Sequence, residues 1–237
     1  MQIDVSVQSV VEKYARALKG PTLLFQLWPA PRPVGRPKQS QSALCGAIVL
    51  GVTGAFEAFA EDLVAAAMIR NGYGWAQVAA NADLTNPSIE DARAKLSHAV
   101  GIDVSGAPEW SLNLPTQSGT SLAWAEKSVS WGRVLDLSKS WIEVRHCLAH
   151  GAVTGIGSEQ WPGPVSSKKF GTKLASANDE GVLARVSGSP GKRALYFWPT
   201  VACARIFAAG AKHLATTVAN EFGEDIDTSA LPDFKSV

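Results

Sequence analysis

The sequence has little cysteine and almost no net charge. Its three cysteines, Cys45, Cys147 and Cys203, are widely spaced and form no CxxC pair. That usage favours a reducing cytoplasm over a disulfide framework. Lysine and arginine number 22 against 21 acidic residues, for a formal net charge of +1. No global basic field therefore indicates nucleic acid, and any RNA contact must come from a local patch or from the meeting of two subunits.

A long uninterrupted apolar run is also lacking. Residues 43–69 lean apolar, but Glu57, Glu61 and Asp62 interrupt them. A membrane span would be free of such charges over about 20 residues. The chain starts with Met-Gln-Ile-Asp and has no basic region ahead of an apolar core, so we expect an amphipathic helix there and not a signal peptide. We expect a soluble, cytoplasmic protein without membrane contact.

Apolar residues recur mostly at helical spacing, and Ser88 followed by Asp91 resembles a capping box. The region 155–190 is rich in Gly, Ser and Pro, and two short apolar runs flanking 187–191 predict a β-hairpin. The sequence predicts a mainly all-α fold: one helical domain over 1–222, with a loop and β-hairpin insertion at about 155–199, and a flexible tail at 223–237. The expected helices are 5–18, 41–70, 75–81, 88–100, 121–130, 137–151 and 200–222.

The stretch Arg145-His146-Cys147-Leu148-Ala149-His150-Gly151 carries the most chemistry. Histidine takes or gives a proton near neutral pH, and arginine is a permanent cation whose donors match a phosphate. On a helix, Glu143, His146 and His150 share one stripe, whereas Arg145 lies roughly 140° round and about 7.5 Å along the axis from His150. One helix cannot easily aim both side chains at one phosphate. Two copies meeting antiparallel can bring them to one cleft.

Other interpretations of this stretch stay open. The residues can be a solvated helix end, where His150 gains from the helix dipole. Glu143, His146 and His150 also have metal-ligand spacing, with Glu57 and Glu61 as further carboxylates, but no second Glu-x-x-His copy exists in the chain. Cys147 and His150 can form a thiol–imidazole pair, which would leave the arginine without a role. We expect no metal and no other cofactor.

The order of a long helix carrying Phe56-Glu-Ala-Phe-Ala-Glu-Asp-Leu63 and a later helix carrying Arg-His-x3-His-Gly resembles the HEPN superfamily of helical ribonucleases. The RiboL-PSP-HEPN-like branch is the most similar. The family signature is an arginine, a polar residue directly after it, and a histidine four to six residues on, which Arg145, His146 and His150 match. The resemblance covers roughly 41–151, and it implies a HEPN-like helical bundle.

The resemblance implies a metal-independent endoribonuclease with a composite site across a homodimer, acting as a toxin or anti-phage effector with a possible antitoxin protein. His150 would transfer the proton, Arg145 would clamp the phosphate, and His146 would orient the site. The expected reaction is attack of a ribose 2′-OH on its own 3′-phosphate, giving a 2′,3′-cyclic phosphate. The alternative is a catalytically silent HEPN-like module that binds RNA or a partner protein.

Further residues are expected to support this site. Glu57 or Glu61 would pair with Arg145 and hold its guanidinium in place, whereas Asp62 would be solvated. Trp161 is expected to be exposed, and Trp124, Trp131 and Trp141 to pack in the core. The candidate RNA-binding residues are Arg133, Lys139, Lys168, Lys169 and Lys173.

Overall fold

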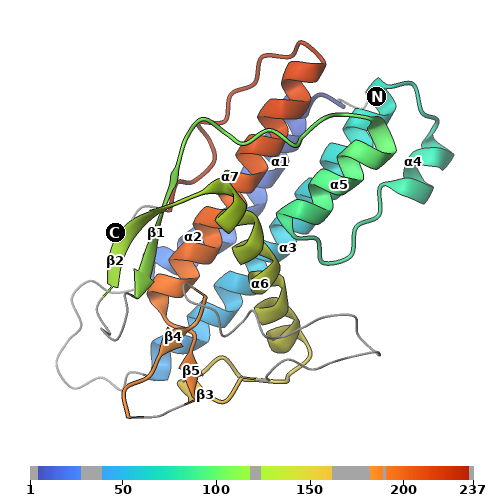
Figure 1. Cartoon of the computed structure of the whole chain (residues 1–237). Coiled ribbons are helices and arrows are strands. Elements are labelled where there is room, and N and C mark those ends of the chain that lie inside the picture. Colours follow the sequence, from blue (N-terminus) through green and yellow to red (C-terminus); the bar gives the residue numbers. More distant parts are fainter. Residues whose placement is uncertain (1–4, 28–38, 118–123, 162–181, 189–190, 235–237) are drawn as a thin grey trace.

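The computed structural model describes residues 5–27, 39–117, 124–161, 182–188 and 191–234. These residues form a mostly helical protein with two small antiparallel sheets (Figure 1). In chain order the elements are α1 (Val7–Ala17), α2 (Lys19–Gln26), α3 (Gln39–Arg70), α4 (Trp75–Asn81), α5 (Ile89–Val100), β1 (Leu112–Gln117), β2 (Trp124–Val129), α6 (Trp131–Ala149), β3 (Ser158–Glu159), β4 (Ala184–Arg185), β5 (Arg193–Ala194) and α7 (Phe197–Glu221).

Helix α3 is the centre of the bundle, packed against α1, α2, α4, α5, α6 and α7. Its Phe56 and Phe59 are buried, with the Phe56 ring 5.0 Å from that of Phe207 on α7 and the Phe59 ring 4.9 Å from that of Tyr14 on α1. Each fully buried aromatic ring of this kind contributes about 1.5–3 kcal/mol of transfer free energy. The apolar side chains of α3 therefore account for the positions of the helices around it.

By length and composition α3 is also apolar enough to cross a membrane, since Ala43–Arg70 contains a window of mean hydropathy 1.8. Half of that window is buried inside the protein. The core helix of a soluble protein passes the same test, and the arrangement is compatible with a soluble protein.

Several expected helices are confirmed: the long helix as α3, 75–81 as α4, 88–100 as α5, and the final helix as α7. In α5, the Ser88 hydroxyl accepts the Asp91 N–H and the Asp91 carboxylate accepts the Ser88 N–H, so the capping box is complete. Helix α2 is not among the expected helices. Pro21 lies in the first turn of α2, where the N–H it lacks would have no partner in the helix, and its ring packs on Gly51.

The helix expected over 121–130 is wrong, since residues 124–129 form strand β2. Its partner β1 pairs with it from Leu112↔Val129 to Gln117↔Trp124. This pairing overrides local helical spacing, because a strand draws its stability from its neighbours. Ser130 then caps α6 by accepting the Arg133 N–H, so that helix begins at Trp131 and not at 137.

The expected hairpin is confirmed as two very short strands, with Ala184 paired to Ala194 and Arg185 to Arg193. A third strand, β3, pairs with the other edge of β5. Trp161 follows β3 and is 3% exposed, so its expected exposure is wrong. Trp141 is fully buried, as expected, whereas Trp124 lies half-buried on β2.

The tail after Gly223 was expected to be flexible, but residues 223–234 pack against the bundle. Glu224 accepts the Val7 N–H and pairs with Arg70 at 2.8 Å. Phe234 is buried, with its ring 5.3 Å from that of Phe25 on α2. The tail is held because an apolar anchor and an ion pair offset the entropy of ordering it.

Candidate functional site

The Arg–His stretch lies at the C-terminal end of α6. A Schellman motif ends the helix: the Ala152 N–H donates to the Cys147 carbonyl at 2.9 Å and the Gly151 N–H to the Leu148 carbonyl at 3.2 Å. Gly151 has φ +66°, the left-handed conformation that such an ending requires. His150 is therefore the last residue before the chain turns, and its side chain is exposed.

Arg145 is held by Glu57 of the central helix. Its Nη2 donates to Glu57 Oε2 at 2.7 Å, and the two side chains are 20% and 23% exposed. The other oxygen, Glu57 Oε1, accepts the backbone N–H of Asn86 at 2.9 Å. Of the two carboxylates expected to pair with Arg145, the structure selects Glu57. One carboxylate therefore links α6 to the loop between α4 and α5.

Glu61 lies one turn further along α3 and has a different partner. Its Oε1 accepts the Leu84 N–H at 3.2 Å, in the same α4–α5 loop. Asp62 instead forms an exposed ion pair with Lys13 at 3.2 Å, on the solvated edge where it was expected. Glu57 and Glu61 thus anchor one loop to α3 side by side, and only Glu57 also reaches the arginine.

The rings of His146 and His150 lie close together, one helical turn apart, in a tilted arrangement. Their ring centroids lie 4.4 Å apart with an interplanar angle of 49°. The pKa of His146 is lowered from its usual value, first by burial and then by electrostatic interaction with His150 and Arg145. A lowered pKa keeps this imidazole neutral near pH 7, with one ring nitrogen free of a proton as an acceptor.

The buried side of α6 gives the metal and thiol interpretations no support. Glu143 is 8% exposed, its Oε2 has no hydrogen-bond partner, and burial raises its pKa. Within the described residues, no group of three or more His, Cys, Asp or Glu side chains is arranged to hold a metal ion. Cys147 is buried too, and burial with the nearby Glu143 raises the pKa of its thiol to about 11. Such a thiol is a poor nucleophile near neutral pH.

The expected RNA-binding residues are not brought to the Arg–His stretch. Lys168, Lys169 and Lys173 lie outside the described residues. Arg133 and Lys139 lie on α6, but 17 and 11 residues before His150, which is roughly 25 and 16 Å along the axis at about 1.5 Å per residue. Two other cations, Arg185 and Arg193, are directly opposite each other on β4 and β5. Both lie within the region predicted to form the hairpin, and their opposition follows from the register of the two strands.

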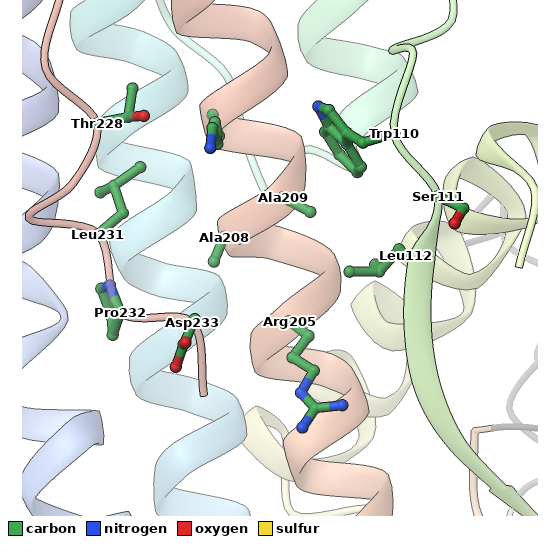
Figure 2. Close-up of a pocket in the computed structure, with 11 residues that line it drawn as sticks. Trp110, Ser111, Leu112, Arg205, Ala208, Ala209, Thr228, Leu231, Pro232 and Asp233 are labelled. Carbon is green, nitrogen blue, oxygen red and sulfur yellow. The ribbon is translucent and has the colours of Figure 1, made fainter. Parts of the chain in front are cut away.

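A separate pocket of about 300 Å³ lies between the C-terminal tail, α7 and β1 (Figure 2). Ala208 and Ala209 of α7 form its floor, and Trp110 and Leu231 lie on opposite sides. Arg205 lies at one end, with its Nε donating to the Phe234 carbonyl and its Nη1 to Glu126 and Asn113. This arginine has a structural task, because it ties the tail and the β1–β2 sheet to α7.

In comparisons with known proteins, the chain matches no family model, no curated protein and no solved structure. The assignment of function therefore depends on the residues themselves.

Proposed function

We propose that this protein is a metal-independent endoribonuclease with a HEPN-like fold, in which the end of α6 supplies the catalytic groups. The observation that carries the proposal is the Arg145–Glu57 ion pair on the same helix end as the close His146–His150 ring contact. It places a permanent cation, a neutral imidazole and an exposed imidazole within five residues of one helix end. Groups of these kinds bind a phosphodiester and transfer the protons that its cleavage requires.

In the proposed reaction a ribose 2′-OH attacks the adjacent phosphorus while its proton passes to a neutral imidazole. The bond from phosphorus to the 5′-oxygen breaks, and that oxygen takes up a proton from an imidazolium. The products are a 2′,3′-cyclic phosphate and a 5′-OH end, with no redox change. His150, which is exposed, transfers the proton, while His146 orients the site. Such proton transfer is typically worth about 10²–10⁴ in rate.

Arg145 binds the negative charge that appears on the phosphorane. Glu57 limits the rotamers of this arginine, so less entropy is lost when the guanidinium meets the phosphate. DNA lacks the 2′-OH nucleophile and is not a substrate.

A homodimer completes the site. Arg145 and His150 project from one helix in directions roughly 140° apart, so a single α6 does not aim both at one phosphate. Two copies of α6 meeting antiparallel bring the arginine of each toward the histidine of the other. We propose that the protein acts in the cytoplasm as a toxin or anti-phage effector, with an antitoxin protein as a possible partner.

The test is cleavage of total RNA and transfer RNA in excess EDTA by the parent chain, by His150→Ala and by His98→Ala. His98 is an exposed histidine on α5 and serves as the matched control. We expect the parent and His98→Ala to leave 2′,3′-cyclic phosphates and His150→Ala to be inactive.

Cleavage that EDTA abolishes would contradict the metal-free reaction. No cleavage by the parent would favour the silent module, and a strictly monomeric protein by light scattering would contradict the shared site.

A further inference from the structure

The pocket between α7, β1 and the C-terminal tail is separate from the proposed catalytic groups, since no residue of the Arg–His stretch lines it (Figure 2). Its volume of about 300 Å³ is in the range of pockets that bind small molecules. Most of the lining is apolar, with a few polar side chains, which is typical of a ligand site. The apolar members are Trp110, Leu112, Ala208, Ala209, Leu231 and Pro232.

Trp110 gives the pocket an aromatic wall that a second tryptophan supports. Its ring lies 5.9 Å from that of Trp131, the first residue of α6, in an edge-on arrangement with an interplanar angle of 79°. The Trp110 side chain is nevertheless 37% exposed. Leu231 lies on the opposite side of the pocket, and Ala208 and Ala209 form the floor (Figure 2). The space between Trp110 and Leu231 therefore suits a flat ring that covers two small side chains.

One end of the pocket has a guanidinium nitrogen that no described residue occupies. Arg205 is 8% exposed. Its Nε and Nη1 donate to the Phe234 carbonyl, the Asn113 carbonyl and the Glu126 carboxylate. In the described part of the chain, the buried side-chain nitrogens without a partner all belong to tryptophans, so the unoccupied Nη2 is open to solvent. Because its charge is already paired with Glu126, this guanidinium suits a neutral acceptor such as a carbonyl oxygen.

The pocket lining also contains an exposed cation that suits a phosphate. Lys212 lies seven residues after Arg205 on α7, so the two share one face of the helix, roughly 10 Å apart along its axis. Of the described residues that line the pocket, only Asp233 is acidic. Asp233 precedes Phe234, whose carbonyl Arg205 binds, and so belongs to the Arg205 end. A lysine ammonium is a compact point charge that binds phosphates.

We propose that this pocket binds a nucleoside monophosphate. The base lies between Trp110 and Leu231, where it stacks on the indole. An acceptor on the edge of the base receives a hydrogen bond from Arg205 Nη2, and the phosphate meets Lys212. A flat ring with acceptors on one edge, joined through a sugar to a phosphate, matches all three features of the pocket. Every base has a π-face, so the tryptophan wall accepts any of them.

The same chemistry is present in a free nucleotide and in the terminal nucleotide of an RNA strand. The inference does not depend on the proposed function, because the pocket uses none of the groups at the end of α6.

The test is titration of isotope-labelled protein with AMP, CMP, GMP and UMP, each followed by two-dimensional NMR. The indole N–H signal of Trp110 reports on the pocket, and it is assigned by its absence from Trp110→Phe. Affinities in the variants come from the amide signals of α7. Each nucleoside, which lacks the phosphate, and ribose 5-phosphate, which lacks the base, are titrated beside the nucleotides. Circular dichroism checks the fold of each chain.

We expect at least one nucleotide to shift the Trp110 signal and ribose 5-phosphate to leave it unchanged. Trp110→Ala should weaken nucleotide binding at least about fivefold, the lower end of the cost of one lost base stack. Lys212→Gln should lower the affinity for the nucleotide to about that of the parent for its nucleoside. The matched control is Lys192→Gln, which removes an exposed lysine outside the pocket and should bind as the parent does.

A second variant fills the pocket without changing its charge. Ala209→Leu places a larger side chain on the floor, at a half-buried position, and should abolish binding (Figure 2). Ala79→Leu makes the same substitution at an exposed position on α4 and is the matched control. Should Ala209→Leu fail to fold, Ala209→Met takes its place with the same expected loss.

The inference is overturned if no nucleotide at millimolar concentration shifts the Trp110 signal. Undiminished binding by the Ala209 variant, or equal affinities for Lys212→Gln and Lys192→Gln, would overturn it as well. A further titration uses a 5′-phosphorylated RNA trinucleotide. Tighter binding than that of the mononucleotide indicates the end of an RNA strand as the ligand, and equal or weaker binding indicates a free nucleotide.

Discussion

Replacing Glu57 by Gln is the most direct test of how the candidate site is held. The substitution keeps the side-chain shape and an oxygen that can accept the Asn86 N–H. It removes the charge that faces Arg145 Nη2 at 2.7 Å. Glu61→Gln, one turn along α3, is the matched control, since Glu61 accepts only the Leu84 N–H among its described contacts.

The expected loss follows from the partial burial of the pair. A hydrogen bond to a charged group is worth about 1.5–3 kcal/mol, and a fully exposed ion pair only about 0–1 kcal/mol. With the two side chains 20% and 23% exposed, the Glu57–Arg145 pair is nearer the first case. We expect Glu57→Gln to lower the free energy of unfolding by about 1.5–3 kcal/mol and Glu61→Gln by less than about 1 kcal/mol.

The assay is urea unfolding followed by circular dichroism, completed as a double-mutant cycle with Arg145→Met. The two substitutions remove opposite ends of one contact, so we expect a coupling of at least about 1 kcal/mol. A coupling below about 0.5 kcal/mol, or equal losses for Glu57→Gln and Glu61→Gln, would refute the reasoning. RNA cleavage by Glu57→Gln is expected to fall with it, because the arginine loses the group that orients it.

Three further outcomes are expected from urea unfolding. The pKa of His146 is lower in the folded state than its unfolded value of about 6.5, so the unfolded chain binds the proton first as the pH falls. The parent should therefore lose more stability than His146→Gln between about pH 7 and about pH 5. Equal losses in the two chains would contradict this. Ser88→Ala removes the N-cap of α5 and should cost about 1 kcal/mol, whereas an unchanged midpoint would argue against the capping box. Gly155→Ala should lower the free energy of unfolding more than Gly157→Ala. Both glycines have positive φ, where an alanine costs roughly 1–2 kcal/mol, but only the alanine at 155 would place a Cβ 2.7 Å from Leu148.

Most of the helices could be predicted because the residues that stabilise them are close together in the sequence. The apolar face of α3 and the Ser88–Asp91 capping box are visible within one segment of sequence. Strand β2 could not be predicted, since most of residues 124–129 is exposed and the strand exists through its pairing with β1. Trp161 illustrates the same limit, because a loop residue is buried only where the rest of the fold covers it.

The candidate site could likewise be predicted only in part. The spacing of Arg145, His146 and His150 on one helix follows from helical geometry alone, and the contact between the two histidine rings agrees with it. The choice of Glu57 over Glu61 depends on how α3 is rotated against α6, which involves residues 88 apart in the chain. The opposition of Arg185 and Arg193 depends on the register of β4 against β5, which no single strand sequence contains.

The apolar length of α3 also affects how the unfolded chain interacts with a lipid bilayer. Once unfolded, Ala43–Arg70 is a segment that a lipid bilayer of ordinary thickness can accept. What opposes its insertion is the acidic group at Glu57, Glu61 and Asp62, since an ionised side chain such as Asp costs about 2.5–3.5 kcal/mol at the centre of a membrane helix. Glu57 and Glu61, which anchor a loop and an arginine in the folded protein, would thus also make insertion of the unfolded chain into a bilayer less favourable. Variants that neutralise them should accumulate in the membrane fraction of expressing cells beyond what their loss of stability explains.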